Sequence, residues 1–217
     1  MCGRYSFYVE DKLIRERFGV TVQTAIYKAR YNCAPSQELA VISNDQPGEL
    51  RFFKWGLIPF WAKDPAIGNR MINAKAETLS EKSSFRNAFR TKRCLVPSDG
   101  FFEWKKDRDK TPYRITLNDG SPFAMAGLWD RWVSADGEII HSFTIITTSP
   151  NELMATIHDR MPVILSPKDE KTWLSPEPEA VLNALLKPYP AKEMKAFPVS
   201  SLVNNPRNDS AEILVPV

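Results

Sequence analysis

Residues 123–147 read FAMAGLWDRWVSADGEIIHSFTIIT, and this stretch decides the fold class. Its second half alternates between apolar and polar positions and is rich in isoleucine and threonine, a pattern typical of a β-strand. Asp136-Gly137, between the two halves, is a frequent turn pair. We therefore predict strands over 123–128 and 139–147, joined across this turn. His141 lies inside the alternating run and is interpreted as a strand residue without a chemical role.

Comparable short runs lie on both sides of this stretch. Asn44–Gly48 is a turn-rich segment between two of them, which predicts a second hairpin. The other predicted strands are 38–43, 49–55, 94–96, 101–105, 113–117, 161–165 and 195–199. The predicted helices are 11–18, 77–90, a helical turn at 151–157, and 177–186, with loops at 31–35 and 55–61.

The composition agrees with many short elements. The chain has 17 prolines against 9 glycines, together with 12 Phe, 6 Trp and 6 Tyr. Stiff turns between short strands fit this composition better than a helical bundle does. We predict an α+β fold: a single compact domain over residues 1–217, with mostly antiparallel strands in a strand-rich core and several short peripheral helices.

Charge and cysteine content exclude several classes of protein. The net charge of +3 is only mildly basic, so an anionic partner has to be met by a local patch. No apolar run reaches the roughly 18 residues that span a bilayer, and the first residues do not form a signal peptide. We expect a cytoplasmic protein without membrane partners. The three cysteines form no Cys-x-x-Cys pair and the chain has 2 histidines, so we expect reduced thiols, no metal site and no cofactor.

Cys2 is the first candidate for chemistry, because Met1 is readily removed before a small residue. Removal would leave an α-amine with a pKa of roughly 7.7–8.0 beside a thiol with a pKa of roughly 8.5. Such a 1,2-aminothiol can form a Schiff base with an aldehyde and then close a thiazolidine ring through sulfur. For Met-Cys alone, a small residue in a frayed terminus is the better interpretation.

Three further segments carry ionisable or amide groups in tightly packed surroundings: 71–78, 98–105 and 157–162. In the second, Glu103 follows two phenylalanines in a predicted strand, where partial burial would raise its pKa toward neutrality. An outward-facing position is equally consistent with strand alternation. In the third, His158 can act as an acid or base, although a hydrogen-bonded loop histidine is commoner.

Basic and aromatic residues alternate through 85–93, and a cationic groove with stacking rings is how single-stranded nucleic acids are held. Arg86 and Arg90 would supply the charge. An amphipathic helix with Phe85 and Phe89 in the core and a solvated basic face is the simpler interpretation.

Six motifs in the same order along the chain resemble the SRAP family, the SOS-response-associated peptidases. They are MCGRY (1–5), YNCAP (31–35), WGLIP (55–59), INAKAET (72–78), DGFFEW (99–104) and IHDRMP (157–162). The resemblance continues to the terminal AEILVPV (211–217). It therefore covers essentially the whole chain.

The resemblance implies a sensor of abasic sites in single-stranded DNA that acts in the DNA damage response. Cys2 would form a thiazolidine DNA–protein crosslink that shields the lesion, after autocatalytic peptidase removal of Met1. Asn73 would orient the reacting groups, Glu103 would transfer protons, and His158 would assist sugar-ring opening and crosslink reversal. This corresponds to a crosslinking, lyase-type enzyme associated with the nucleoid during damage.

The resemblance also implies residues that hold the DNA. Arg4, Lys75 and Arg160 match positions that contact backbone phosphates, and Trp61 and Trp104 are stacking or wedge residues. Lys75 departs from the arginine that is frequent in the family, so it loses the bidentate fork for phosphate. We expect a monomer, with replication-fork proteins as candidate partners.

Three other functions stay open on the sequence. An N-terminal cysteine followed by glycine also opens the glutamine-hydrolysing amidotransferases. Cys2, Glu103 and His158 could instead cleave peptide bonds in other proteins. A noncatalytic single-strand binder would use only Arg4, Arg86, Arg90 and the tryptophans. The variant Cys2→Ala separates these classes, because binding would survive it and crosslinking would not.

Overall fold

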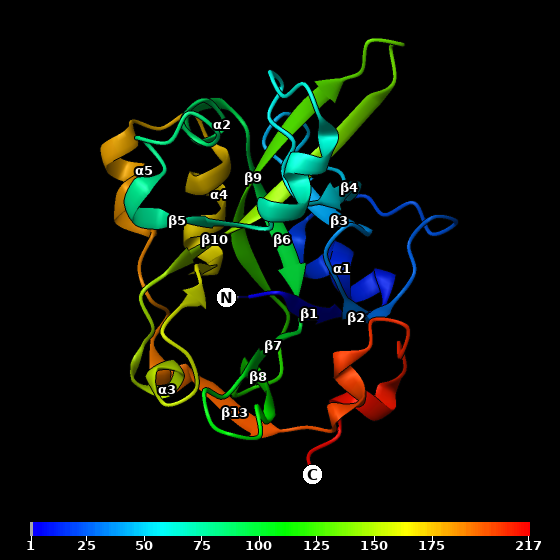
Figure 1. The fold of residues 1–217 in the computed structure, drawn as a ribbon, viewed down its shortest axis with the longest axis vertical. Coiled ribbons are helices and arrows are strands. Elements are labelled where there is room, and N and C mark those ends of the chain that lie inside the picture. Colours follow the sequence, from blue (N-terminus) through cyan, green and yellow to red (C-terminus); the bar gives the residue numbers. More distant parts are fainter. Residues whose placement is uncertain (1) are drawn as a thin grey trace.

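The computed structural model describes residues 2–217, and its strands form two sheets (Figure 1). Met1, whose removal the sequence predicts, lies outside the described residues. One sheet has the order β13-β8-β7-β1-β2, and the other runs β11-β10-β4-β3-β6-β9-β12, with β5 added beside β10. The strands are β1 (Arg4–Phe7), β2 (Arg30–Cys33), β3 (Glu38–Ser43), β4 (Arg51–Trp55), β5 (Asn73–Lys75), β6 (Arg93–Ser98), β7 (Gly100–Trp104), β8 (Pro112–Leu117), β9 (Phe123–Val133), β10 (Ile139–Thr148), β11 (Met161–Pro162), β12 (Ile164–Leu165) and β13 (Met194–Pro198).

The larger sheet closes into a barrel, because β9 pairs with both β6 and β10. The predicted hairpin is confirmed and is longer than predicted, with Val133 opposite Ile139 at its outer end. Figure 1 shows this pair of strands extending beyond the barrel. The sequence underestimates β9 because Asp130 interrupts its apolar pattern; that carboxylate is buried and accepts a hydrogen bond from Lys92 Nζ. The predicted hairpin of 38–43 and 49–55 is also present, and its second strand begins at Arg51.

Most strand pairs are antiparallel, as predicted, and the exceptions are the parallel pairs of β10 with β4 and with β5. The α+β class with a strand-rich core is confirmed. The predicted loop at 31–35 is wrong in its first half, because β2 pairs with β1 through Cys33 and Tyr5. This pairing satisfies backbone groups with a partner far away in sequence, which a local pattern does not reveal.

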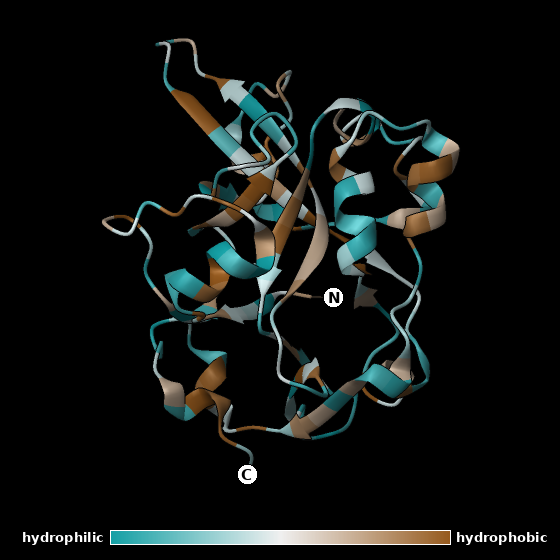
Figure 2. Ribbon diagram, turned by 180° about the vertical axis from the view of Figure 1, so that it is seen from behind, coloured by the Kyte–Doolittle hydropathy of each residue, from teal (hydrophilic) through white to brown (hydrophobic). Residues whose placement is uncertain are grey.

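Short helices surround the sheets, and in Figure 2 they carry both hydrophilic and hydrophobic residues, as expected of peripheral helices. The predicted helix at 11–18 is confirmed, and Gly19 ends it in the left-handed conformation with φ 66°. None of the helices within residues 2–217 is long and apolar enough to cross a membrane. The helices are α1 (Asp11–Phe18), α2 (Arg86–Thr91), α3 (Glu152–Ala155), α4 (Pro167–Leu174) and α5 (Glu179–Leu185), with 3₁₀ turns at Pro65–Arg70, Ala76–Thr78, Ala191–Glu193, Ser201–Asn204 and Ala211–Leu214.

The predicted continuous helix over 77–90 is wrong. A 3₁₀ turn ends at Thr78, and α2 begins only at Arg86. The intervening Ser83-Ser84 pair has weak helix propensity, and the segment turns so that Phe89 packs against Trp173 of α4. Helix α4 was not predicted, although its first residue is a proline, a favoured residue at that position.

A buried arginine joins α2 and α4 to the barrel. Arg93 at the start of β6 is 1% exposed. Its guanidinium donates hydrogen bonds to backbone carbonyls at the ends of both helices, those of Phe89, Arg90, Trp173 and Ser175. These contacts offset the cost of burying the charge, so Arg93 caps two helices that would otherwise leave carbonyl groups without partners.

The aromatic segment after β4 is held by a close approach of two glycines. An added Cβ on Gly68 would lie 2.7 Å from the Gly56 carbonyl oxygen and 3.1 Å from Ile58 Cγ1. Gly56 itself has φ 131°, which L side chains rarely adopt. The backbone contact between these glycines therefore fixes the loop that presents Phe60 and Trp61.

We predict that Gly68→Ala lowers the free energy of unfolding by about 1–3 kcal/mol, because the new methyl group overlaps a backbone carbonyl. Gly48→Ala is the matched control, since an added Cβ there meets nothing within 4 Å. Urea unfolding of both variants and the parent checks this. Equal midpoints for Gly68→Ala and Gly48→Ala would contradict the packing described.

Candidate active site

Cys2 lies inside the molecule although it is the second residue of the chain. It is 0% exposed and belongs to the main hydrophobic core, just before β1. Figure 1 shows the start of β1 in the middle of the structure. Burial raises the pKa of the Cys2 thiol to about 12, and the nearby Glu103 carboxylate adds to this rise. The thiol therefore needs a base before it can act as a nucleophile, and it lies within electrostatic range of one.

Glu103 is placed by β7, which pairs antiparallel with β1. Phe102 and Trp104 on the same strand pack against the C-terminal segment, so Glu103 points to the opposite side. Glu103 is 3% exposed, which excludes the outward-facing interpretation. Burial raises the pKa of its carboxyl group to about 7, because the charged form loses hydration. A carboxyl group with this pKa can both give and take a proton at neutral pH.

His158 follows α3 and approaches Glu103 from another part of the chain. Its Nε2 lies 3.8 Å from Glu103 Oε1, and its side chain is 15% exposed. The Arg160 backbone N–H lies 3.1 Å from Nδ1, and Asp159 Oδ1 lies 2.9 Å from the same nitrogen. Burial lowers the pKa of His158, so the ring is mainly neutral at pH 7. The structure thus brings Cys2, Glu103 and His158 into one cluster.

Asn73 lies in β5, which pairs with the C-terminal part of β10, as does β11 after His158. It pairs with Ile145 in the parallel β5–β10 ladder, while Pro162 of β11 pairs with Thr147 two residues further along β10. Its Nδ2 donates to the Ile145 carbonyl at 3.4 Å. Its Oδ1 is buried and has no hydrogen-bond partner within residues 2–217. A buried acceptor of this kind is suited to receive a donor from a bound molecule.

Three of the predicted DNA-binding arginines already have partners in the protein. Arg160 forms a bidentate ion pair with Glu77 at 2.7 and 2.9 Å. Arg90 pairs with Glu179. Arg4 donates to Asn32 Oδ1 and to the Val203 carbonyl, both at 2.9 Å.

The predicted cations Lys75 and Arg86 are both exposed, and neither forms an ion pair with any other residue in 2–217. The carboxylate partners Glu77 and Glu179 were not identified from the sequence. Each is about 80–90 residues from its arginine, and no local pattern links them.

The two predicted tryptophans have different environments. Trp61 is 47% exposed and lines a groove of about 630 Å³ with Phe60, Arg86 and Arg90. Trp104 is half-buried against the C-terminal segment, and its Nε1 donates to Asn204 Oδ1 at 2.8 Å. Trp61 is therefore available to a stacking partner, and Trp104 mainly packs. Phe60, which the sequence analysis did not single out, is 55% exposed in the same groove.

The proposed amphipathic character of the basic segment is also seen. Phe85 and Phe89 are 6% and 0% exposed, so they belong to the core. Arg86 and Arg90 lie on the opposite, solvated side and face the groove. The amphipathic-helix and the cationic-groove interpretations are therefore compatible, because one face of the segment packs in the core while the other lines the groove.

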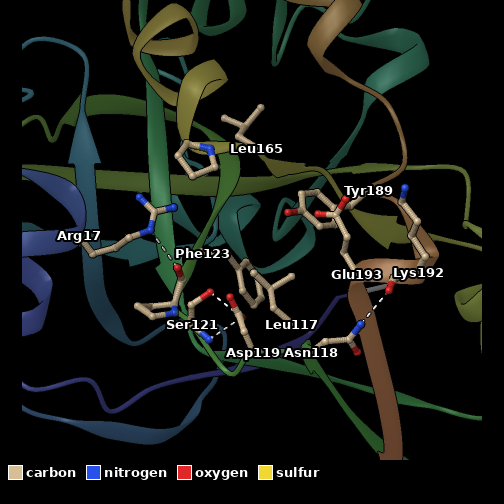
Figure 3. Close-up of a pocket in the computed structure, with 12 residues that line it drawn as sticks. Arg17, Leu117, Asn118, Asp119, Ser121, Phe123, Leu165, Tyr189, Lys192 and Glu193 are labelled. Atoms are coloured by element: carbon tan, nitrogen blue, oxygen red, sulfur yellow. Dashed lines mark hydrogen bonds between the residues drawn. The ribbon is translucent and has the colours of Figure 1, made fainter.

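A second hollow lies elsewhere on the molecule, beside the β8–β9 turn (Figure 3). It has a volume of about 340 Å³. Its polar groups bond to one another: Ser121 donates to Asp119, and Asn118 donates to the Lys192 carbonyl. None of the residues predicted to act in chemistry or DNA binding lines it, so it is separate from the candidate site.

Among the described residues, the candidate site has no recognisable set of metal ligands. Within residues 2–217, His, Cys, Asp and Glu side chains form no group of three suited to a metal ion. Cys2, Cys33 and Cys94 are free and buried. What the site does offer is a thiol, a carboxyl group of raised pKa, a neutral imidazole and a buried amide oxygen.

Comparisons with known proteins identify the family of this chain. The pattern of the family described as SOS response associated peptidase (SRAP) matches residues 1–206. The abasic site processing protein YoqW of Bacillus subtilis (strain 168) is 49% identical over 222 residues, which cover 99% of each chain. The abasic site processing protein YedK of Escherichia coli (strain K12) is 34% identical, over 87% of this chain and 85% of its own. A crystal structure of a protein from Bacteroides thetaiotaomicron superimposes with a TM-score of 0.92 and 33% identity, over 100% of both chains. The chain therefore belongs to the SOS response associated peptidase (SRAP) family.

Proposed function

We propose that this protein binds abasic sites in single-stranded DNA and forms a covalent thiazolidine crosslink through Cys2 once Met1 has been removed. The observation that carries the proposal is the buried Glu103 carboxyl group, with a pKa of about 7, beside the N-terminal cysteine and within 3.8 Å of His158. The names of the relatives, abasic site processing proteins, support the choice of substrate.

Crosslink formation needs one proton to be given and one to be taken. The Cys2 α-amine attacks the aldehyde carbon of the opened abasic sugar, and the resulting carbinolamine loses its hydroxyl group as water when an acid protonates it. The Cys2 sulfur then attacks the Schiff-base carbon while a base removes the thiol proton. One water leaves in total. Glu103 can supply the first proton and recover the second, because its pKa lies near the working pH.

His158 and Asn73 complete this chemistry. The abasic sugar is closed as a hemiacetal before reaction, and opening it requires a proton transfer that a neutral imidazole can assist. The buried Asn73 Oδ1 is an acceptor for the Cys2 amine or for a sugar hydroxyl. Running in reverse, the same steps release the DNA.

The same cluster would also remove Met1. Hydrolysis of the Met1–Cys2 amide needs a base to activate the nucleophile and an acid to protonate the leaving amine, and Glu103 and His158 can fill these roles. Self-processing of this kind accounts for a peptidase name without requiring other protein substrates.

A DNA strand would be held beside the cluster by charge and stacking. Lys75 and Arg86 are exposed cations, and Trp61 offers a ring to an unstacked base. Arg160 and Arg90 would exchange their carboxylate partners for phosphates on binding. We also propose that the protein acts as a monomer and joins the nucleoid and replication-fork proteins at sites of damage.

The first prediction concerns Cys2→Ala. A single-stranded oligonucleotide with one abasic site should form a denaturant-stable adduct with the parent protein, detected by mass spectrometry as the sum of both masses less one water and less Met1. The variant should form none, because the ring needs sulfur, while its affinity for the oligonucleotide stays within about twofold. An adduct with Cys2→Ala would exclude the thiazolidine, and glutamine hydrolysis by the parent protein would instead favour an amidotransferase.

The second prediction concerns the rate of crosslinking. Glu103→Gln should slow adduct formation by about 100-fold or more, because the amide cannot exchange a proton. Glu138→Gln, an exposed position in the β9–β10 hairpin, should leave the rate unchanged. Single-turnover gels at pH 7 measure both rates. If Glu103→Gln reacts as fast as the control, Glu103 has no part in proton transfer.

The third prediction concerns stability. The pKa of Glu103 is raised from 4.5 in the unfolded chain to about 7 in the folded protein. The unfolded chain therefore releases this proton at lower pH than the folded protein does, so the folded state is destabilised as pH rises from 4.5 through 7. Glu103→Gln should therefore be more stable than the parent at pH 8, by roughly 3 kcal/mol. The difference should shrink as pH falls toward 5. Chemical unfolding across this pH range tests it, and a constant difference would contradict the raised pKa.

A further inference from the structure

Two groups compete for one ring nitrogen of His158. The Arg160 backbone N–H lies 3.1 Å from Nδ1, and Asp159 Oδ1 lies 2.9 Å from it. An imidazole nitrogen without a proton accepts a hydrogen bond, and one with a proton donates. Nδ1 can accept from Arg160 or donate to Asp159, but it cannot do both at once.

The choice at Nδ1 decides what Nε2 presents to Glu103. When Nδ1 accepts from Arg160, the neutral ring carries its proton on Nε2 and directs it toward Glu103 Oε1, 3.8 Å away. When Nδ1 donates to Asp159, the neutral ring presents the Nε2 lone pair instead. The first arrangement stabilises a Glu103 carboxylate, and the second accepts a proton from the carboxylic acid.

Asp159 is free to change its position. Its side chain is 66% exposed, and its other oxygen, Oδ2, lies 2.8 Å from Lys106 Nζ, which is itself 59% exposed. An exposed ion pair of this kind contributes little stability, so it does not lock the carboxylate in place. The Lys106 backbone N–H donates to the Ile157 carbonyl at 3.2 Å, which keeps the segment after β7 beside the histidine.

Within residues 2–217, the charged groups around the ring come from two segments, and the charge at the N-terminus of the chain also lowers the pKa of the ring. Glu103 and Lys106 belong to β7 and the residues that follow it, and Asp159 and Arg160 adjoin the histidine itself. The Arg160 guanidinium is turned away toward Glu77, so only its backbone N–H acts on the ring.

We propose that Asp159 is a positioning residue that selects which nitrogen of His158 carries the proton. The proposal rests on the crosslinking function proposed above. The two competing contacts would allow His158 to match two states of Glu103, because crosslinking needs Glu103 first as an acid and then as a base. A histidine partner that can present either a lone pair or an N–H matches both states of the carboxyl group. Glu103 gives one proton to the leaving hydroxyl group and later takes another from the Cys2 thiol. Glu103 and His158 therefore end in the protonation states in which they started.

The test is nitrogen NMR of protein carrying ¹⁵N-labelled histidine. The chain has 2 histidines, so a His141→Gln variant assigns the signals of His158. We expect Asp159→Ala to leave one tautomer, with the proton on Nε2, and to lower the pKa of His158 because a nearby negative charge is gone. Asp159→Glu should restore the Nδ1-protonated form in part. Asp136→Ala, an exposed aspartate in the β9–β10 hairpin, is the matched control and should change neither property.

Crosslinking provides the second readout. Asp159→Ala should slow adduct formation about tenfold and move the acidic limb of its pH profile to lower pH, together with the pKa of His158. Unchanged His158 tautomer and pKa in Asp159→Ala would overturn the proposal, and so would a shifted tautomer with an unchanged pH profile. The NMR result does not depend on activity. A parent protein that forms no adduct therefore refutes the proposed function, whereas unaltered NMR signals refute the role of Asp159.

Discussion

The burial of one carboxyl group, Glu103, is the constraint on which the site depends. Because β7 packs on both faces, it offers no solvated position for this side chain. Ionising the carboxyl group there costs free energy, so its pKa rises to about 7. The fold tolerates this cost beside an N-terminal cysteine and a histidine. A poised acid next to a potential aminothiol is of use to a reaction that gives and takes a proton, and this is why we place the chemistry here.

The topology explains how the site assembles from distant residues. Antiparallel pairing of β1 with β7 carries the chain start to the strand of Glu103, and the closed barrel presents the end of β10 to β5 and β11. Asn73 and His158 arrive from these two neighbours. Because Cys2 starts inside the core rather than in a frayed tail, its surroundings are fixed before any DNA binds. Such preorganisation suits covalent capture of an aldehyde.

Sequence reasoning succeeded where the pattern is local and failed where the partner is remote. The 11–18 helix and both hairpins follow from periodicity and turn residues, whereas β2 depends on pairing with β1 and was predicted as a loop. The candidate residues were named through family resemblance, but alternation could not decide the direction of Glu103, because both Phe101 and Phe102 beside it are buried. The same limit applies to the arginines. Their carboxylate partners are set by tertiary contacts, so a cation that resembles a phosphate ligand can be occupied in the protein alone.

In the folded protein, Glu103 should be half-protonated near neutral pH. Carbon NMR of protein labelled at the glutamate side-chain carboxyl carbon, with Glu103→Gln to assign the signal, measures this directly. We expect a titration midpoint for Glu103 near pH 7, well separated from those of exposed glutamates. A midpoint near 4.5, the ordinary value, would mean that Glu103 is ionised at neutral pH and lacks the proton that crosslinking requires of it.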